Sequence, residues 1–371
     1  MVDELRIGAD YLATQIHSEE FRLEALSHRN IEKVFQSTLS EDLVEFSANG
    51  KVIERGVLFA TQLMGDDDLL SDDQFATKQR FHEAMALEFS TQWLLDDLCD
   101  SADRIPTSQR TPLLELVGRS YSASFQLDDA RIAATTDDIH TSVMLRHFAS
   151  LFVVRNDRLL TAGIDISREG IPRQLMLEFW STWEDAHRHF SDYGEYRRHR
   201  ANNCGLPNTG YWSALWYSYI TGIDMQECEA HPRATCEIIR QFAMIGALCN
   251  DLAGYEKDLQ EGVANAVIVV ARGRPEPDES DRLAAAFDVV IEMHNGLLEN
   301  LKKELRNASP GEAMVLHGMT RSAWACRILH EQNREIYNCD GLNRAIDRAF
   351  AEDRQEGWAA ALGCERRMSG Q

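Results

Sequence analysis

Three carboxylates interrupt an apolar, helix-like stretch that reads ALEFSTQWLLDDLCDSADR. Phe89, Trp93, Asp96 and Asp100 are spaced i, i+4, i+7 and i+11, so they share one helix face, with Asp97 beside them. A buried carboxylate without a partner is costly or takes up a proton, so the cluster indicates solvent or a cation. Carboxylate oxygens are the ligands that Mg²⁺ prefers, usually together with substrate phosphates. The stretch therefore predicts a magnesium site beside an aromatic wall, with a solvated helix end as the alternative.

A second polar group lies in FAMIGALCNDLAGYEKDLQEGVANAV, residues 242 to 267. Asn250, Gly254 and Asp258 follow at i, i+4 and i+8, within an arc of roughly 80° on one helix face. A glycine inside a helix costs about 1 kcal/mol relative to alanine, so it suggests a close approach by a ligand, a water or a neighbouring helix. This segment is a second candidate metal site. A glycine that serves helix packing, flanked by surface polar residues, is the alternative.

The elements that must position these residues are predicted to be helices, because apolar residues recur at helical spacing and alternating, strand-like stretches are hard to find. Turn-forming residues separate the segments, and no internal repeat or composition shift marks a domain boundary. We therefore expect an all-α fold with a single domain over residues 1–371, a core from about 20 to 345, and less ordered ends. The expected helical segments are 74–101, 112–128, 141–163, 172–192, 211–223, 233–260, 281–306 and 311–337.

Composition narrows the range of partners. The 371 residues are 44% hydrophobic and carry a formal net charge of −22, which argues against nucleic acid and against an anionic membrane surface. A polyanionic substrate would need bound cations or local arginines. Eight cysteines without a CxxC pair indicate reduced thiols, and the chain opens without a signal-like segment, so we expect a soluble, cytoplasmic protein. Cys228, His231 and Cys236 offer a zinc site as an alternative, without an apparent fourth ligand.

The two motifs together carry a family resemblance. DDLCD resembles the DDxxD motif of class I terpene synthases, and NDLAGYEKD resembles their second metal-binding motif, NDxx(S/T/G)xxK(E/D). The similarity continues at Gly262 and at Asn265, Ala266 and Val267, where bacterial members often carry Gly and then Asn-x-Val. The resemblance implies an antiparallel helical bundle around a deep apolar cavity. It also implies that the two motif helices face each other across this cavity and hold three Mg²⁺ ions.

The resemblance assigns roles to the residues of the first motif. Asp96 would bridge two magnesium ions. Asp100 would help directly or through a water, and Asp97 would support the site by hydrogen bonding.

In the second motif, Asn250 and Asp258 would chelate the third ion, and Lys257 would reach toward the diphosphate. Two positions depart from the family pattern. Gly254 stands where the family most often has Ser or Thr, so a water must fill that coordination position. Asp258 replaces the commoner Glu and is one methylene shorter.

Basic residues that would recognise the diphosphate are also implied. Arg200, four residues after Tyr196, matches the arginine that family members carry upstream of the second motif, and Arg197 after Tyr193 is its rival. A solvated basic helix end is the alternative reading of this region. By the same resemblance, Asn203 and Cys204 would lie at a helix break that transmits diphosphate binding to the cavity.

Near the C-terminus, Arg334 and Tyr337 would take the place of the family's Arg-Tyr pair, although they are one turn apart rather than adjacent.

The activity implied is magnesium-dependent ionisation of a prenyl diphosphate, followed by cyclisation of the carbocation and release of diphosphate. Aromatic faces attract cations by up to about 2 kcal/mol or more when desolvated, although each ring taken singly is more often ordinary core. The expected substrate is C20 geranylgeranyl diphosphate rather than C15 farnesyl diphosphate, with a bicyclic C20 diphosphate also possible, and the expected assembly is a monomer or homodimer. The candidate wall residues are Phe89, Trp93, Phe242, Trp212, Trp216 and Trp324.

Three other functions compete with this interpretation. A chain-elongating prenyl transferase would have a second DDxxD motif, which Asn250 and Lys257 argue against. A protonation-initiated class II cyclase would need a DxDD motif on a different helical domain. A catalytically silent helical interaction protein remains open because of the departures at Gly254 and Asp258.

Overall fold

The computed structural model describes residues 23–64, 72–100, 105, 107–122, 125–164, 175, 189–202, 204, 206–223, 225, 228 and 230–332. Every regular element in these ranges is a helix, so the all-α prediction is confirmed for them. The chain divides into two compact units, Met1–Glu169 and Gly170–Gln371. That the two units form one domain stays a prediction, and both expected less-ordered ends lie outside the described residues.

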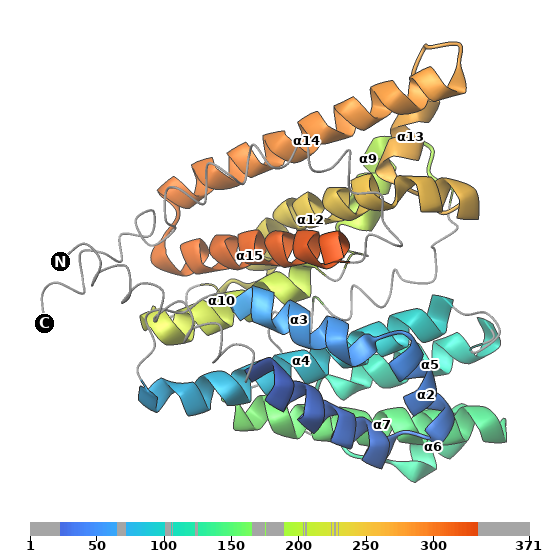
Figure 1. Cartoon of the computed structure of the whole chain (residues 1–371), viewed down its shortest axis with the longest axis vertical. Coiled ribbons are helices and arrows are strands. Elements are labelled where there is room, and N and C mark those ends of the chain that lie inside the picture. The colour runs from blue at the N-terminus through green and yellow to red at the C-terminus, as the bar shows by residue number, and fades with distance from the viewer. Residues whose placement is uncertain are drawn as a thin grey trace, which may run out of the picture. The chain divides into compact units, whose positions relative to one another are not determined.

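The first unit is a layered arrangement of helices around α4. The helix α4 packs on α3 and on α7, and α5 and α6 also pack on α7 (Figure 1). Residues 23–38 form a further helix ahead of them. Its labelled helices are α2 (Glu41–Asn49), α3 (Val52–Met64), α4 (Asp72–Asp100), α5 (Thr107–Ser120), α6 (Asp129–Thr135) and α7 (Ile139–Thr161).

A buried ion pair fixes α4 against α7. Nε of Arg155 lies 3.3 Å from Oε2 of Glu88, and both side chains are almost wholly buried. The hydroxyl of Tyr121 donates to Oε1 of Glu88 at 2.7 Å, and the Arg155 guanidinium lies 4.2 Å from the centre of the Tyr121 ring. Burial, followed by the nearby Glu88 charge, raises the pKa of Tyr121 well above its usual value. Because the charges are paired inside the unit, this part of α4 is anchored two turns before Asp96.

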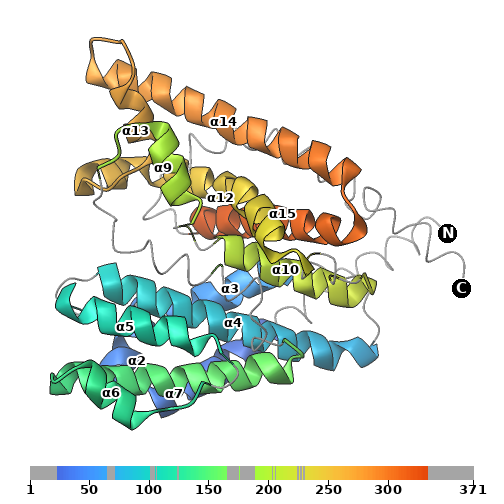
Figure 2. The same cartoon turned by 180° about the vertical axis from the view of Figure 1, so that it is seen from behind.

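The second unit is built around α12. This helix packs against α10, α14 and α15, while the short α13 packs on α14 and lies beside α9 (Figure 2). Its helices are α9 (Tyr193–Arg200), α10 (Leu206–Thr221), α12 (Pro232–Glu261), α13 (Ala266–Arg272), α14 (Glu279–Asn307) and α15 (Pro310–Gln332).

Two glycines allow α10 and α15 to cross in direct backbone contact. A Cβ added at Gly318 would overlap the carbonyl oxygen of Gly210. The Thr209 hydroxyl bonds to that of Ser322, and the Thr221 hydroxyl lies 3.7 Å from the sulfur of Met314. Residue numbers therefore rise on α10 as they fall on α15, so the helices are antiparallel. The start of α10 lies beside the middle of α15, where Thr209 meets Ser322.

The long helices agree with the sequence prediction and the short ones do not. The segments expected at 74–101, 141–163, 233–260 and 281–306 are α4, α7, α12 and α14. The segment expected at 172–192 lies almost wholly outside the described residues. The helix at residues 23–38 and the helices α2, α3, α6, α9 and α13 were not predicted.

Within the described ranges, no helix combines the length and the apolar character that crossing a membrane requires.

Candidate functional site

The second motif lies on one face of α12, near the end of that helix. Asn250 and Asp258 are half-buried and Gly254 is buried between them. The helix ends because Gly262 adopts the left-handed conformation, with φ of 70°, and the backbone N–H of Val263 bonds to the carbonyl of Asp258 at 2.9 Å. Glycine takes this conformation without the strain that other residues pay. The chain therefore turns back at once toward the motif.

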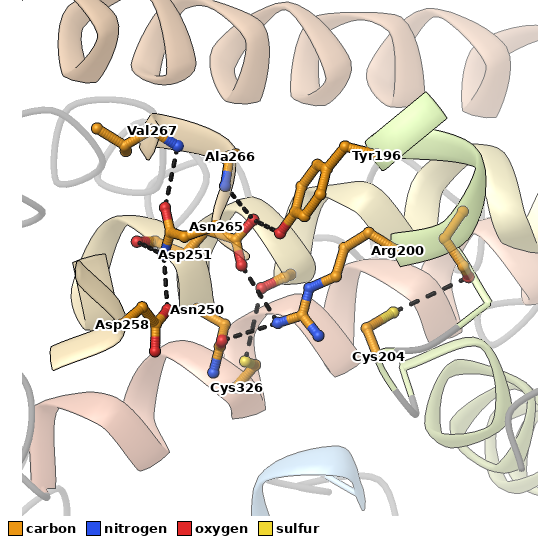
Figure 3. Close-up of polar contacts among 12 residues, drawn as sticks. Tyr196, Arg200, Cys204, Asn250, Asp251, Asp258, Asn265, Ala266, Val267 and Cys326 are labelled. Atoms are coloured by element: carbon orange, nitrogen blue, oxygen red, sulfur yellow. Dashed lines mark hydrogen bonds and ion pairs between the residues drawn. The ribbon is translucent and has the colours of Figure 1, made fainter. Parts of the chain in front are cut away.

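Asn265, which begins α13, connects the two helices at this turn. Its Oδ1 accepts from the backbone N–H of Val267 at 2.9 Å, which caps α13. Its Nδ2 donates to the carbonyl of Asp251 at 2.8 Å and to Oδ2 of Asp258 at 2.7 Å. Figure 3 shows Asn265 between the two carboxylates. This contact orients Asp258 and leaves its other carboxylate oxygen available to a ligand.

Asp251 is the buried anchor of the site. Its Oδ2 accepts from the Tyr196 hydroxyl at 2.5 Å and from the backbone N–H of Ala266 at 3.3 Å, and its Oδ1 accepts from Nη2 of Arg200 at 3.2 Å (Figure 3). Burial raises the pKa of Asp251, while the charge of Arg200 and the bond from Tyr196 oppose this. The sequence analysis missed Asp251. The signal that could have found it is the spacing of Tyr196 and Arg200 at i and i+4.

Arg200 is the basic residue that the structure brings to the second motif. Nη2 of Arg200 donates to Oδ1 of Asn250 at 2.9 Å, and the same nitrogen pairs with Asp251. Burial alone would lower the pKa of Arg200, but the Asp251 carboxylate outweighs it, so the pKa is raised. Its rival Arg197 is exposed on the same short helix. Binding of diphosphate by Arg200 stays a prediction.

The helix break expected at residues 203–204 agrees with the structure. The helix α9 ends at Arg200 and α10 begins at Leu206, so Cys204 lies between them. Asn203 lies outside the described residues.

The amide nitrogen of Asn250 has its own partner, which the sequence analysis missed. Nδ2 of Asn250 lies 2.9 Å from Nε2 of His330 on α15. His330 is 2% exposed, and burial lowers its pKa to about 4, so its imidazole is neutral near pH 7. No sequence pattern pointed to it, because its contact depends on how α15 packs on α12.

The oxygens on this face of α12 fit a magnesium ion. Oδ1 of Asn250 and the carboxylate of Asp258 are hard ligands of the kind that Mg²⁺ binds. A Cβ added at Gly254 would meet only Asp258, at 3.4 Å from Oδ2, so the space beside the motif is not closed by another element. Burial raises the pKa of Asp258, and a cation beside it would favour the charged form.

Lys257 lies away from these ligands. Its side chain is exposed, and its Nζ lies 3.7 Å from Oε2 of Glu261. Contact of Lys257 with a diphosphate stays a prediction.

The first motif belongs to the first unit, Met1–Glu169. Asp96 and Asp97 are half-buried near the end of α4, and the side chain of Asp100 lies outside the described residues. Asp97 pairs with Arg55 of α3, whose guanidinium lies 5.7 Å from the centre of the Trp93 ring. A supporting role for Asp97 in a metal site stays a prediction. Magnesium binding by Asp96 and Asp100 stays a prediction.

The aromatic candidates near the first motif pack on one another. Phe89 is buried, with its ring centre 5.2 Å from that of Phe59, and Trp93 lies at the same distance from Phe59.

In the second unit, Phe242, Trp212 and Trp216 are buried, and half-buried Trp324 lies 5.7 Å from the guanidinium carbon of Arg327. That these rings line a cavity stays a prediction. Arg334 and Tyr337 lie outside the described residues.

The zinc alternative finds no support within the described residues. Cys228 and Cys236 are buried, and the described part of the chain contains no group of three or more His, Cys, Asp or Glu side chains that could hold a metal. A pair such as Asn250 and Asp258 is a different kind of site, completed by substrate and water oxygens.

Comparison with known proteins agrees with this description. Residues 176–300 match the family model described as terpene synthase family 2, C-terminal metal binding. This segment includes the Arg200 helix, both candidate ligands on α12 and the Asn265 cap. The resemblance to class I terpene synthases is therefore confirmed, and within residues 176–300 it is a match to the C-terminal metal-binding part of a terpene synthase family.

Two solved structures from Streptomyces resemble the chain. The 2-methylisoborneol synthase of Streptomyces coelicolor A3(2), solved with Mg²⁺ and geranyl-S-thiolodiphosphate, has a TM-score of 0.49 and 15% identity, covering 77% of this chain and 92% of its own. The linalool/nerolidol synthase of Streptomyces clavuligerus has a TM-score of 0.48 and 14% identity, covering 83% and 95%. No curated protein sequence matches the chain significantly.

Proposed function

We propose that the protein is a class I terpene cyclase that ionises a prenyl diphosphate with magnesium and cyclises the resulting carbocation, with release of diphosphate. The observation that carries this proposal is the contact of Arg200 with Asn250. It places a charged donor on the amide oxygen of a residue in a metal-binding motif, inside a segment that matches a terpene synthase model.

The residues of the second motif supply the anion-binding part of the reaction. Asn250 and Asp258 hold one metal ion, and Arg200 donates hydrogen bonds to the diphosphate oxygens. When bound, the magnesium ions neutralise the leaving diphosphate and stabilise the negative charge that develops as the C–O bond breaks. Because Arg200 is planar and always charged, it can bind two diphosphate oxygens at once.

Asp96 and Asp100 bind metal in the same reaction, with Asp97 held by Arg55 in a supporting role. We propose three magnesium ions in all, and we place the enzyme in the cytoplasm. The aromatic side chains named above exclude water and stabilise the cation with their ring faces. The reaction ends with loss of a proton or capture of a water, to give a hydrocarbon or an alcohol.

The preferred substrate is C20 geranylgeranyl diphosphate. The small residues Ala243, Gly246 and Ala247 precede the second motif on α12, and small side chains at these positions favour the longer polyene. A bicyclic C20 diphosphate is an alternative of the same chain length.

The test is incubation of the full chain with C10, C15, C20 and C25 prenyl diphosphates and Mg²⁺, followed by mass analysis of the hydrocarbon extract. We expect a cyclic C20 product that EDTA abolishes. Longer prenyl diphosphates formed on adding isopentenyl diphosphate would instead identify a prenyl transferase. No magnesium-dependent release of diphosphate from any substrate would identify a silent relative.

Two substitutions connect the reaction to the motifs. Asp96→Ala and Asn250→Ala should each remove turnover while circular dichroism shows the helical fold intact. The control is Asp281→Ala, which removes an exposed carboxylate from α14 and should leave turnover unchanged. Turnover that persists in both motif variants would end the assignment.

A further inference from the structure

The side-chain amide of Asn250 is held at both ends. Its Oδ1 accepts from Arg200 at 2.9 Å, and its Nδ2 lies 2.9 Å from Nε2 of His330. An arginine side chain only donates hydrogen bonds and an amide NH₂ group only donates, so Oδ1 must face Arg200 and Nε2 of His330 must be the acceptor. The two contacts therefore specify the same orientation of the amide.

His330 is itself fixed in the tautomer that this contact needs. Its Nδ1 lies 3.6 Å from the sulfur of Cys326, one turn earlier on α15, and Cys326 also bonds it through its backbone. A proton on Nδ1 serves these contacts and leaves the lone pair of Nε2 for Asn250. His330 and Cys326 are both buried. Rotation of the imidazole would leave buried polar atoms unpaired, which is unfavourable.

The proposed function would change one of these two contacts, because it engages Arg200 with the diphosphate. The ligand atom of Asn250 is Oδ1, which Arg200 occupies in this structure, and the proposed function sends Arg200 to the diphosphate. An amide released by Arg200 could turn over and present its NH₂ group to the cation, which would repel it. The acceptor at His330 then alone keeps Oδ1 pointed toward the metal.

We propose that His330 is a positioning residue for metal binding, which holds the Asn250 amide with its oxygen toward the cation through the bond from Nδ2 to Nε2. This inference rests on the proposed function, because it assumes that Asn250 is a metal ligand. Residues that orient metal ligands in this way typically contribute about 10–100-fold to metal affinity.

The test measures metal binding directly. Mn²⁺, as a paramagnetic probe for Mg²⁺, is titrated with inorganic diphosphate into the full chain, and the bound ion is followed by electron paramagnetic resonance. His330→Leu removes the acceptor at similar size, and we expect the Kd for Mn²⁺ to rise about tenfold, within the range for such residues. His330→Gln places an amide oxygen within reach of Nδ2 and should restore most of the affinity.

The same His330 substitution in an Asn250→Asp chain separates an effect on the orientation of residue 250 from an effect on the stability of the fold. A carboxylate has two equivalent oxygens, so an Asn250→Asp chain needs no partner to choose between them. His330→Leu should therefore weaken Mn²⁺ binding in the native chain but change it little in the Asn250→Asp chain. Thermal unfolding without metal, measured on each variant, reports any loss of packing on its own.

The outcomes distinguish the inference from the function it rests on. If the native chain binds Mn²⁺ with diphosphate and His330→Leu binds it equally well, His330 does not position Asn250 and the proposed function stands. The inference also fails if His330→Leu weakens binding equally in both backgrounds, since packing then explains the loss. If the native chain binds no Mn²⁺ with diphosphate, both proposals fail together.

Discussion

The position of Arg200 beside the second motif depends on Asp251, which is not itself proposed to bind metal or diphosphate. Asp251 is almost wholly buried and collects bonds from α9 and from the start of α13. A buried carboxylate that receives an arginine and a tyrosine is well paired, and removing its charge leaves Arg200 without compensation. Asp251 therefore holds Arg200 beside Asn250.

Asp251→Asn should lower the free energy of unfolding by about 3 kcal/mol, as expected when one member of a buried ion pair is removed. Urea denaturation of the full chain would measure the change. Tyr196→Phe is the matched control, because it deletes a single hydrogen bond to the same carboxylate and should cost about 1 kcal/mol. Equal losses in the two variants would show that the charge of Asp251 contributes little.

Gly254 offers a second substitution at the site. Since a Cβ there makes only an ordinary contact with Asp258, serine fits, and its hydroxyl can replace the water proposed as a ligand. Gly254→Ser should tighten Mn²⁺ binding in the presence of diphosphate and stabilise α12 by about 0.5 kcal/mol.

Gly254→Ala is the control for that change. It gains about 1 kcal/mol of helix stability but supplies no oxygen, so its metal affinity should stay unchanged. Tighter binding in both variants would mean that helix stability, and not the hydroxyl, improves the site.

Sequence reasoning found the candidate ligands and missed their partners, for a physical reason. The sequence identifies Asn250 and Asp258 because these polar side chains interrupt an apolar helix face at regular spacing. Arg200 was found by resemblance to a family pattern. His330 lies 80 residues from Asn250, and its contact exists only because α15 packs on α12. Spacing along one helix carries no information about such a pairing.

Whole helices were likewise predicted where their own sequence carries a clear pattern. The long helices α4, α7, α12 and α14 each show several turns of apolar periodicity, which identifies them without knowledge of their neighbours. The unpredicted helices α6, α9 and α13 are seven or eight residues long, too short for periodicity to develop. Pro112 also misled the prediction, because α5 begins at Thr107 and contains the proline. Capping residues could have marked these starts, since Asp128, Asp192 and Asn265 each accept a backbone N–H.

The junction between α12 and α13 can be tested through Asn265. Asn265→Ala removes the cap of α13 together with both bonds from Nδ2, and leaves the buried carbonyl of Asp251 without that donor. We expect a loss of about 2 kcal/mol, combining a cap with an unsatisfied group. Chemical denaturation provides the measurement.

Asn265→Ser separates the two contributions. Its hydroxyl keeps the cap on Val267 but cannot reach Asp258, so its stability should fall between those of the native chain and Asn265→Ala. Asn265→Ser as unstable as Asn265→Ala would mean that the cap contributes nothing.

Over the whole molecule, buried neutral histidines set the response to acid. Burial lowers the pKa of His82 and His317 to about 3 and that of His294 to about 4, and these residues lie in both compact units. Between these values and the unfolded value of 6.5, the unfolded chain binds protons that the folded chain does not. Stability should therefore be unaffected by these groups above pH 6.5 and should fall as the pH drops toward 4.

His82 isolates one such contribution. Its two ring nitrogens lie 2.8 Å from the Ser27 hydroxyl and 3.0 Å from the Thr61 hydroxyl. Between pH 7 and pH 5 it should account for about 2 kcal/mol of lost stability, since one pKa unit corresponds to about 1.4 kcal/mol. His82→Gln should reduce the difference between urea unfolding at these two pH values by that amount. An unchanged difference would show that His82 is protonated in the folded chain.

The glycine crossing of α10 and α15 has a mechanical consequence. Because the two backbones touch at Gly210 and Gly318, neither helix can slide or tilt without carrying the other. The start of α10 follows the Arg200 helix, and His330 lies about two turns after Ser322 on α15. A bound anion that displaces Arg200 could also displace the start of α10. Because α10 and α15 are in contact, this movement would change the position of His330, which bonds to Asn250.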